Sequence, residues 1–155
     1  MGLDMYLSAT KYQSKFWADK NEAQEQYEQM KNLLGCNDFI SNNFDSIHST
    51  VGIAYWRKVN SVHQWFVDNC QNGIDDCRKS YVSRQDLIKL RDICQAILAD
   101  HSLAEELLPT QSGFFFGSTE FDEYYFSDLK DTVTQLNNVL VNVPDDWDFE
   151  YHSSW

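Results

Sequence analysis

The sequence predicts a mainly α fold (α+β): a helical bundle of about four helices with a small two-stranded β element from the chain termini. Apolar residues recur at helical spacing in three long stretches, over residues 54–69, 83–100 and 120–141. Only 2 prolines and 6 glycines interrupt the 155 residues, and both ends of the chain alternate apolar with polar side chains. The length favours one domain that covers residues 1–155.

Each end of the chain is expected to form a short strand, because every second residue there is apolar. At the start these positions are Leu3, Met5 and Leu7. After Pro144 they are Trp147, Phe149 and Tyr151. Pairing of the two strands would make a small antiparallel sheet at the edge of the bundle.

The next two segments are predicted to be a helix and a connection. Residues 18–34 are rich in Glu, Gln, Lys and Met, which favour a helix, and Gly35 is a suitable stop. Residues 36–50 are polar with a few apolar anchors. They fit a loop or a short hairpin, and the sequence leaves both open.

A central helix is predicted over residues 54–69, AYWRKVNSVHQWFVDN, and it has two contrasting faces. The apolar face carries Tyr55, Val59, Val62 and Phe66. A neighbouring face carries Trp56, Asn60 and His63, with Arg57 beside it. The first face is what a core needs, so the second face is the main functional clue.

Two further helices follow, separated by an irregular loop. Ser83 and Asp86 form a capping-box-like start for a helix over residues 83–100, and a short helical turn is expected at 103–108. Thr119 and Asp122 form a similar pair before the longest helix, roughly residues 120–141. Between them, the segment PTQSGFFFGS places three phenylalanines between glycines, which permits a turning backbone that comes close to another group.

The net charge of -12 argues against some classes of partner. Binders of nucleic acid or of membrane surfaces are usually basic, so we expect no membrane partner and no direct nucleic-acid binding. The 4 cysteines show neither a C-x-x-C pair nor zinc-ligand spacing, and no cofactor motif is present. The sequence therefore predicts a cytoplasmic protein with free thiols and without a metal or cofactor.

Four segments carry a resemblance: MGLDMYL, AYWRKVNSVHQWFVDN, GIDDC and LLPTQSGFFFGSTEFDEYY. Together they resemble a family of small proteins frequent in phage and prophage genomes, with the motifs YWRKxNxxHxWF and LLPTxSGFFFGST. No firmly assigned activity comes with this family, so no catalytic residues are carried over. The resemblance implies a phage accessory protein that acts on a host defence or host pathway in the host cytoplasm.

The leading hypothesis places a ligand pocket between the 54–69 helix and the 112–119 loop. Arginine, free backbone N–H groups and aromatic rings suit a nucleobase with a phosphate, and hence sequestration of a small nucleotide-like ligand. The residues assigned to this site are Trp56, Arg57, Asn60, His63, Phe115, Phe116, Gly117, Ser118 and Thr119.

Other interpretations stay open at this level. Aromatic residues at helical spacing are usually core, so any one of these residues can be architectural instead. The acidic charge also fits a protein–protein inhibitor of a host defence complex that mimics nucleic acid, in the manner of an anti-CRISPR protein. A third alternative is a small hydrolase of a nucleotide signal. An oligomer is possible under each of these hypotheses.

Overall fold

The computed structural model describes residues 2–14, 22–40 and 46–155. The chain divides into two compact units, a larger one formed by Met1–Ala9 with Val51–Trp155 and a smaller one formed by Thr10–Thr50. The smaller unit contains α1 (Glu22–Leu33), whose Tyr27 is fully buried. The single domain expected from the sequence stays a prediction, and each unit is described by itself.

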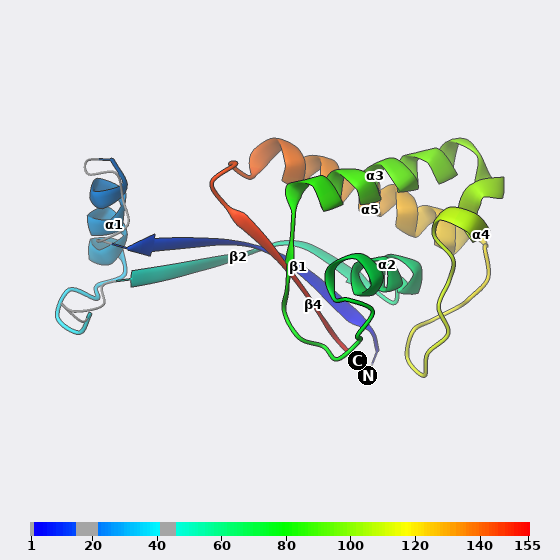
Figure 1. The fold of residues 1–155 in the computed structure, drawn as a ribbon, viewed down its shortest axis with the longest axis horizontal. Helices are drawn as coiled ribbons and strands as arrows, with labels where there is room; N and C mark the ends of the chain where they lie inside the picture. The colour runs from blue at the N-terminus through cyan, green and yellow to red at the C-terminus, as the bar shows by residue number, and fades with distance from the viewer. Residues whose placement is uncertain (1, 15–21, 41–45) are drawn as a thin grey trace. The chain divides into compact units, whose positions relative to one another are not determined.

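The chain forms a four-stranded antiparallel sheet with the strand order β2-β1-β4-β3, of which Figure 1 labels β1, β2 and β4. Its strands are β1 (Asp4–Ser14), β2 (Ser46–Arg57), β3 (Ser80–Val82) and β4 (Asp148–Ser154). Residues 10–14 of β1 and 46–50 of β2 belong to the smaller unit, and the rest of the sheet belongs to the larger one. β3 pairs with β4 in the register Ser80↔Tyr151. β1 and β4 are neighbours, so the predicted pairing of the two chain ends is confirmed.

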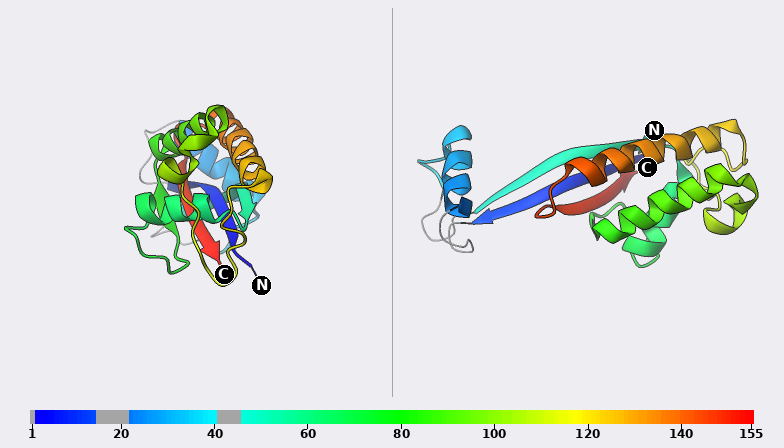
Figure 2. Two further views of the ribbon diagram at one scale, coloured as in Figure 1. Left: turned by 90° about the vertical axis from the view of Figure 1, so that its right-hand side faces the viewer. Right: turned by 90° about the horizontal axis from the view of Figure 1, so that it is seen from above.

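Five helical segments belong to the larger unit. They are α2 (Asn60–Cys70), α3 (Arg84–Ala99), the 3-10 turn η1 (His101–Leu103), α4 (Ala104–Leu107) and α5 (Glu123–Asn142). α3 and α5 lie side by side (Figure 2). Among the described residues, no helix is long and apolar enough to cross a membrane.

The core forms where one face of the sheet meets these helices. The buried positions include Met5, Leu7 and Ala9 along β1 and Phe149, Tyr151 and Ser153 along β4, as strand periodicity requires. α2 packs on the sheet through Phe66, whose ring stacks on that of Tyr151 with 4.0 Å between the centroids. The buried side chains therefore alternate along the strands and follow one stripe along each helix.

The predicted four-helix bundle with a two-stranded β element is wrong. The protein has an α+β fold whose sheet contains four strands, and only two of them were predicted. β2 and β3 were not expected, and residues 54–57 belong to β2 rather than to the central helix. Tyr55 and Trp56 fall by coincidence at helical spacing from the apolar residues of α2. The chain changes direction at Lys58, whose φ of 61° lies outside both helix and strand, so α2 begins only at Asn60.

The helix boundaries show which capping signals were reliable. The capping box of α3 is confirmed: the Ser83 hydroxyl accepts from the Asp86 backbone N–H, and the Asp86 side chain accepts from the Ser83 N–H. The last helix begins at Glu123 with Asp122 as its N-cap, so the start at Thr119 was wrong. In the segment 36–50, β2 begins at Ser46. The expected starting residues 18–21 of the first helix and residues 41–45 lie outside the described residues.

Candidate functional site

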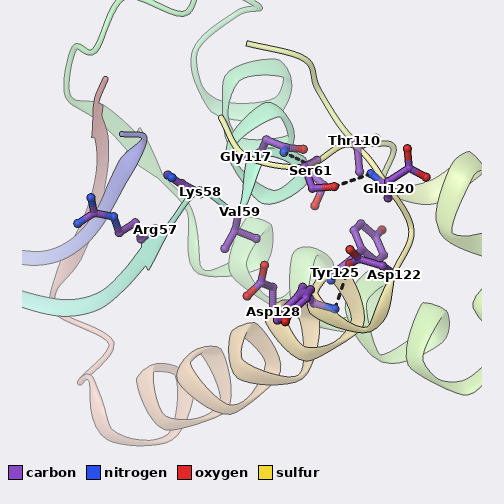
Figure 3. A pocket seen from close by; sticks show the side chains of 13 residues that line it. Arg57, Lys58, Val59, Ser61, Thr110, Gly117, Glu120, Asp122, Tyr125 and Asp128 are labelled. Carbon is purple, nitrogen blue, oxygen red and sulfur yellow. Dashed lines mark hydrogen bonds between the residues drawn. The ribbon is translucent and has the colours of Figure 1, made fainter. Parts of the chain in front are cut away.

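A pocket of about 330 Å³ opens in the larger unit where β2 passes into α2 (Figure 3). The loop of residues 109–122 and the first turns of α5 form its other walls. Side chains of both charges face it. The lining consists of Arg57, Lys58, Val59, Asn60, Ser61, Thr110, Gly117, Ser118, Glu120, Asp122, Tyr124, Tyr125 and Asp128.

The structure brings only part of the sequence-assigned site to this pocket. Four of the nine assigned residues line it, namely Arg57, Asn60, Gly117 and Ser118. The other five are not in its lining, namely Trp56, His63, Phe115, Phe116 and Thr119. Both predicted segments, 54–69 and 112–119, contribute residues to the pocket, but most of the individual side chains assigned to the site do not line it.

Trp56 belongs to the core rather than to a ligand wall. Its side chain is 2% exposed, because Trp56 lies on β2 and faces the helices. The indole Nε1–H donates to the Thr132 hydroxyl of α5 at 3.0 Å, so its one polar group is already bonded. The ring also packs against Phe66, with 6.0 Å between the ring centroids. No ligand contact is left for Trp56 to make.

His63 is the centre of a buried polar cluster outside the pocket. Its ring is fully buried, and Nδ1 lies 2.7 Å from the Tyr151 hydroxyl. Nε2 lies 3.0 Å from the Asp75 carboxylate, which also accepts from the Trp155 indole N–H at 3.1 Å. Burial raises the pKa of Tyr151 well above its usual value, so this hydroxyl stays protonated. The cluster ties α2 to β4 and to the residue 71–79 turn.

Asn60 holds the loop that closes the pocket. Its Nδ2 donates to the carbonyls of Phe116 and Ser118, at 3.0 and 2.8 Å. Its Oδ1 accepts from the Gln111 N–H at 2.9 Å, so three bonds fix both sides of the loop. Between these points Gly117 adopts a φ of 93°, which L side chains rarely adopt. A Cβ there would lie 3.2 Å from the Lys58 carbonyl oxygen, so the loop needs glycine for its close approach to β2.

The first turn of α2 presents unbonded donors to the pocket. Its N-cap is Val59, which makes no side-chain capping bond, and the turn contains no acidic residue. Ser61 lines the pocket, and its hydroxyl, which makes no hydrogen bond to a described residue, is accessible from the pocket rather than buried without a partner. Lys58 lies beside it, and no ion pair joins its ammonium group to a described carboxylate. This end of the pocket therefore suits an anion.

The opposite end of the pocket is acidic. Asp122 is occupied, because its Oδ1 caps α5 by accepting from the N–H groups of Tyr124 and Tyr125 at 3.0 Å. Asp128, nearly two turns further along α5, makes no side-chain hydrogen bond or ion pair with the described residues. Burial, with added repulsion from Asp131 and Asp122, raises the pKa of Asp128 to about 6. Its carboxylate is free to accept hydrogen bonds from a ligand.

Comparisons with protein-family models, with curated proteins and with solved structures find no match. The chemistry of the pocket is therefore inferred from its own residues. Ser61 and Asp128 escaped sequence analysis, because nothing in the sequence shows that they lack partners. Lys58 and Tyr124 were weighed from the sequence, as a source of positive charge in place of Arg57 and as a ring for stacking, and both line the pocket.

Proposed function

We propose that this protein binds and sequesters a small nucleotide-like ligand in the pocket between α2 and the 109–122 loop. The observation that carries the proposal is the uncapped first turn of α2, which lines the pocket with the Ser61 hydroxyl and lies beside Lys58. Free N–H groups at a helix N-terminus, a hydroxyl and an ammonium group are the donors that bind phosphate in many proteins. The phosphate of the ligand occupies this end.

The remaining lining supports a ligand with an aromatic ring. Tyr124 lines the pocket and is 77% exposed, so one face of its ring is open to stacking. The Arg57 side chain is more than half exposed, so its guanidinium is within reach of a charged ligand. Its contact with Asp4 is long, with 3.8 Å between Arg57 Nη1 and Asp4 Oδ1. A pocket of about 330 Å³ corresponds to the small end of ligand sites, which fits a mononucleotide.

The proposal includes a biological setting. Given the resemblance to proteins of phage genomes, we place this protein in the host cytoplasm as an accessory protein. There it lowers the free concentration of a nucleotide signal used by a host defence. Binding alone is sufficient for this role, provided that the protein is present in excess over the signal. Turnover is not part of the proposal.

Isothermal titration calorimetry of the full chain against AMP, GMP, cyclic mononucleotides and ADP-ribose tests the proposal. At least one of these ligands is expected to bind, and Lys58→Ala and Ser61→Ala each weaken binding by roughly 10-fold, because each removes a hydrogen bond to a charged group. Matched controls are Lys130→Ala and Ser127→Ala, which remove exposed side chains of α5 outside the pocket and leave affinity unchanged.

Two results contradict this proposal. One is the absence of binding by every nucleotide tested at millimolar concentration. The other is equal loss of affinity in the pocket variants and in the α5 controls. Chromatography of the ligand after long incubation separates sequestration from hydrolysis, because sequestration returns the ligand intact.

A further inference from the structure

One carboxylate of the pocket has no partner of its own. Asp128 lies on α5, lines the pocket and is half-buried. No described side chain or backbone N–H donates to its carboxylate, whereas the neighbouring Asp122 is used as a helix cap. Asp131 of α5 and the N-cap residue Asp122 carry charge of the same sign and repel it. The protein itself therefore does nothing to stabilise this charge.

An unpaired charge in a half-buried position is unfavourable, so a ligand that supplies N–H donors there gains binding energy. Asp128 and Ser61 line the pocket from different elements, α5 and α2, and Figure 3 shows their side chains apart from one another. A nucleotide whose phosphate lies near Ser61 extends its base toward the carboxylate. The base edge, rather than the phosphate, is what Asp128 meets.

We infer that the ligand carries a guanine-type base, whose N1–H and exocyclic amino group both donate to the Asp128 carboxylate. This inference rests on the proposed function. An ionised carboxylate has two acceptor oxygens and no donor, so it matches two adjacent N–H groups. Guanine presents such a pair. Adenine and cytosine each present a donor beside an acceptor, and uracil flanks one N–H with two carbonyl oxygens, so each of them turns a lone pair toward the carboxylate.

Calorimetry with four mononucleotides, GMP, IMP, AMP and XMP, tests the inference in wild type and in Asp128→Asn. Wild type is expected to bind GMP about 10-fold to 100-fold more tightly than AMP. AMP loses one hydrogen bond to the charged carboxylate, and the N1 lone pair of its adenine faces the carboxylate oxygen. IMP, which keeps N1–H but lacks the amino group, lies between them. Asp128→Asn weakens GMP and strengthens XMP, because an amide offers one donor and one acceptor to the N1–H and O2 of xanthine.

The control variant is Glu123→Gln, which removes an exposed carboxylate of α5 outside the pocket and leaves the order of affinities unchanged. Equal binding of GMP and AMP, with no change of order in Asp128→Asn, overturns the inference. If Lys58→Ala and Ser61→Ala still weaken both ligands in that case, the proposed function stands. If none of the four nucleotides binds but a cyclic mononucleotide or ADP-ribose does, the inference fails and the proposed function stands. If none of the probes of either experiment binds, both fail.

Discussion

Two polar clusters use residues of α2, and they differ in whether their groups have partners. Around His63, both ring nitrogens, the Tyr151 hydroxyl and the Trp155 indole are hydrogen-bonded within the protein. At the first turn of the same helix, the Ser61 hydroxyl has no such partner among the described residues. A fully bonded polar cluster stabilises a fold, whereas unbonded groups facing a pocket point to a ligand. The presence of partners, more than residue type, separates architecture from binding.

Replacement of His63 should give the largest effect on stability. His63→Ala removes a buried ring and leaves the Tyr151 hydroxyl and the Asp75 carboxylate without their shared partner. We expect the free energy of unfolding to fall by about 3–5 kcal/mol, measured by urea denaturation. His48→Ala, at an exposed position, is the control and should cost less than about 1 kcal/mol. A loss this small at His63 would remove the distinction between the two clusters.

Asn60 lines the pocket, but its side-chain amide is hydrogen-bonded within the protein like the groups around His63. We therefore expect its replacement to affect stability. Asn60→Ala removes three hydrogen bonds to the loop, so we expect a loss of about 2–3 kcal/mol in stability. Hydrogen exchange at the Gln111 amide should also become faster, since this amide loses its acceptor. Asn138→Ala, on the exposed surface of α5, should change neither quantity. Unchanged protection of Gln111 in Asn60→Ala would refute the assigned role.

Asp128 should show the smallest effect, and one that depends on pH. Its pKa in the folded protein is raised to about 6, so ionisation of this carboxyl opposes folding above pH 6, and the penalty disappears as pH falls toward 4. Asp128→Asn should therefore be more stable than wild type at pH 7.5. The raised pKa would correspond to a difference of at most about 3 kcal/mol in the free energy of unfolding. Because the carboxylate is only half-buried, solvent screening reduces the expected difference to about 1 kcal/mol.

Urea denaturation at pH 7.5, 6 and 4 measures this difference, which should shrink to near zero at the lowest pH. Glu105→Gln, at an exposed carboxylate of α4 without an ion pair among the described residues, controls for the general effect of removing one negative charge. If the stability of Asp128→Asn matched that of wild type at every pH, the carboxylate would not be strained, and the reason to expect a ligand there would weaken.

Sequence periodicity predicted the helices better than the sheet. The 83–100 stretch gave α3 with its cap, because apolar spacing and capping residues agree there. Periodicity gave the wrong structure for residues 46–57, because Tyr55 and Trp56 continue the helical spacing of α2 although they lie on β2. The β-branched residues of this segment, such as Thr50, Val51 and Ile53, favour a strand and were the available contrary signal. β3, with three residues, is too short to show any period.

The candidate site was only partly predictable for a different reason. The sequence indicated that residues 54–69 and 112–119 meet, and Asn60 does bond to the loop. Which side chains face the pocket depends on where β2 ends. The strand ends before Lys58, which has a left-handed φ, so Trp56 lies on the strand and its side chain is buried in the core. The unbonded state of Ser61 and Asp128 is a three-dimensional property, because it depends on what neighbouring elements fail to supply.

The strand order has a consequence for synthesis of the chain. The two central strands of the sheet, β1 and β4, come from opposite ends of the sequence. Leu3, Met5 and Leu7 are made more than a hundred residues before their neighbouring strand β4. Until residues 148–154 emerge, the inner edge of β1 has no partner and its apolar face lacks part of its cover. The sheet can therefore close only after translation has passed residue 154, and its pairing of distant segments makes slow folding the expectation.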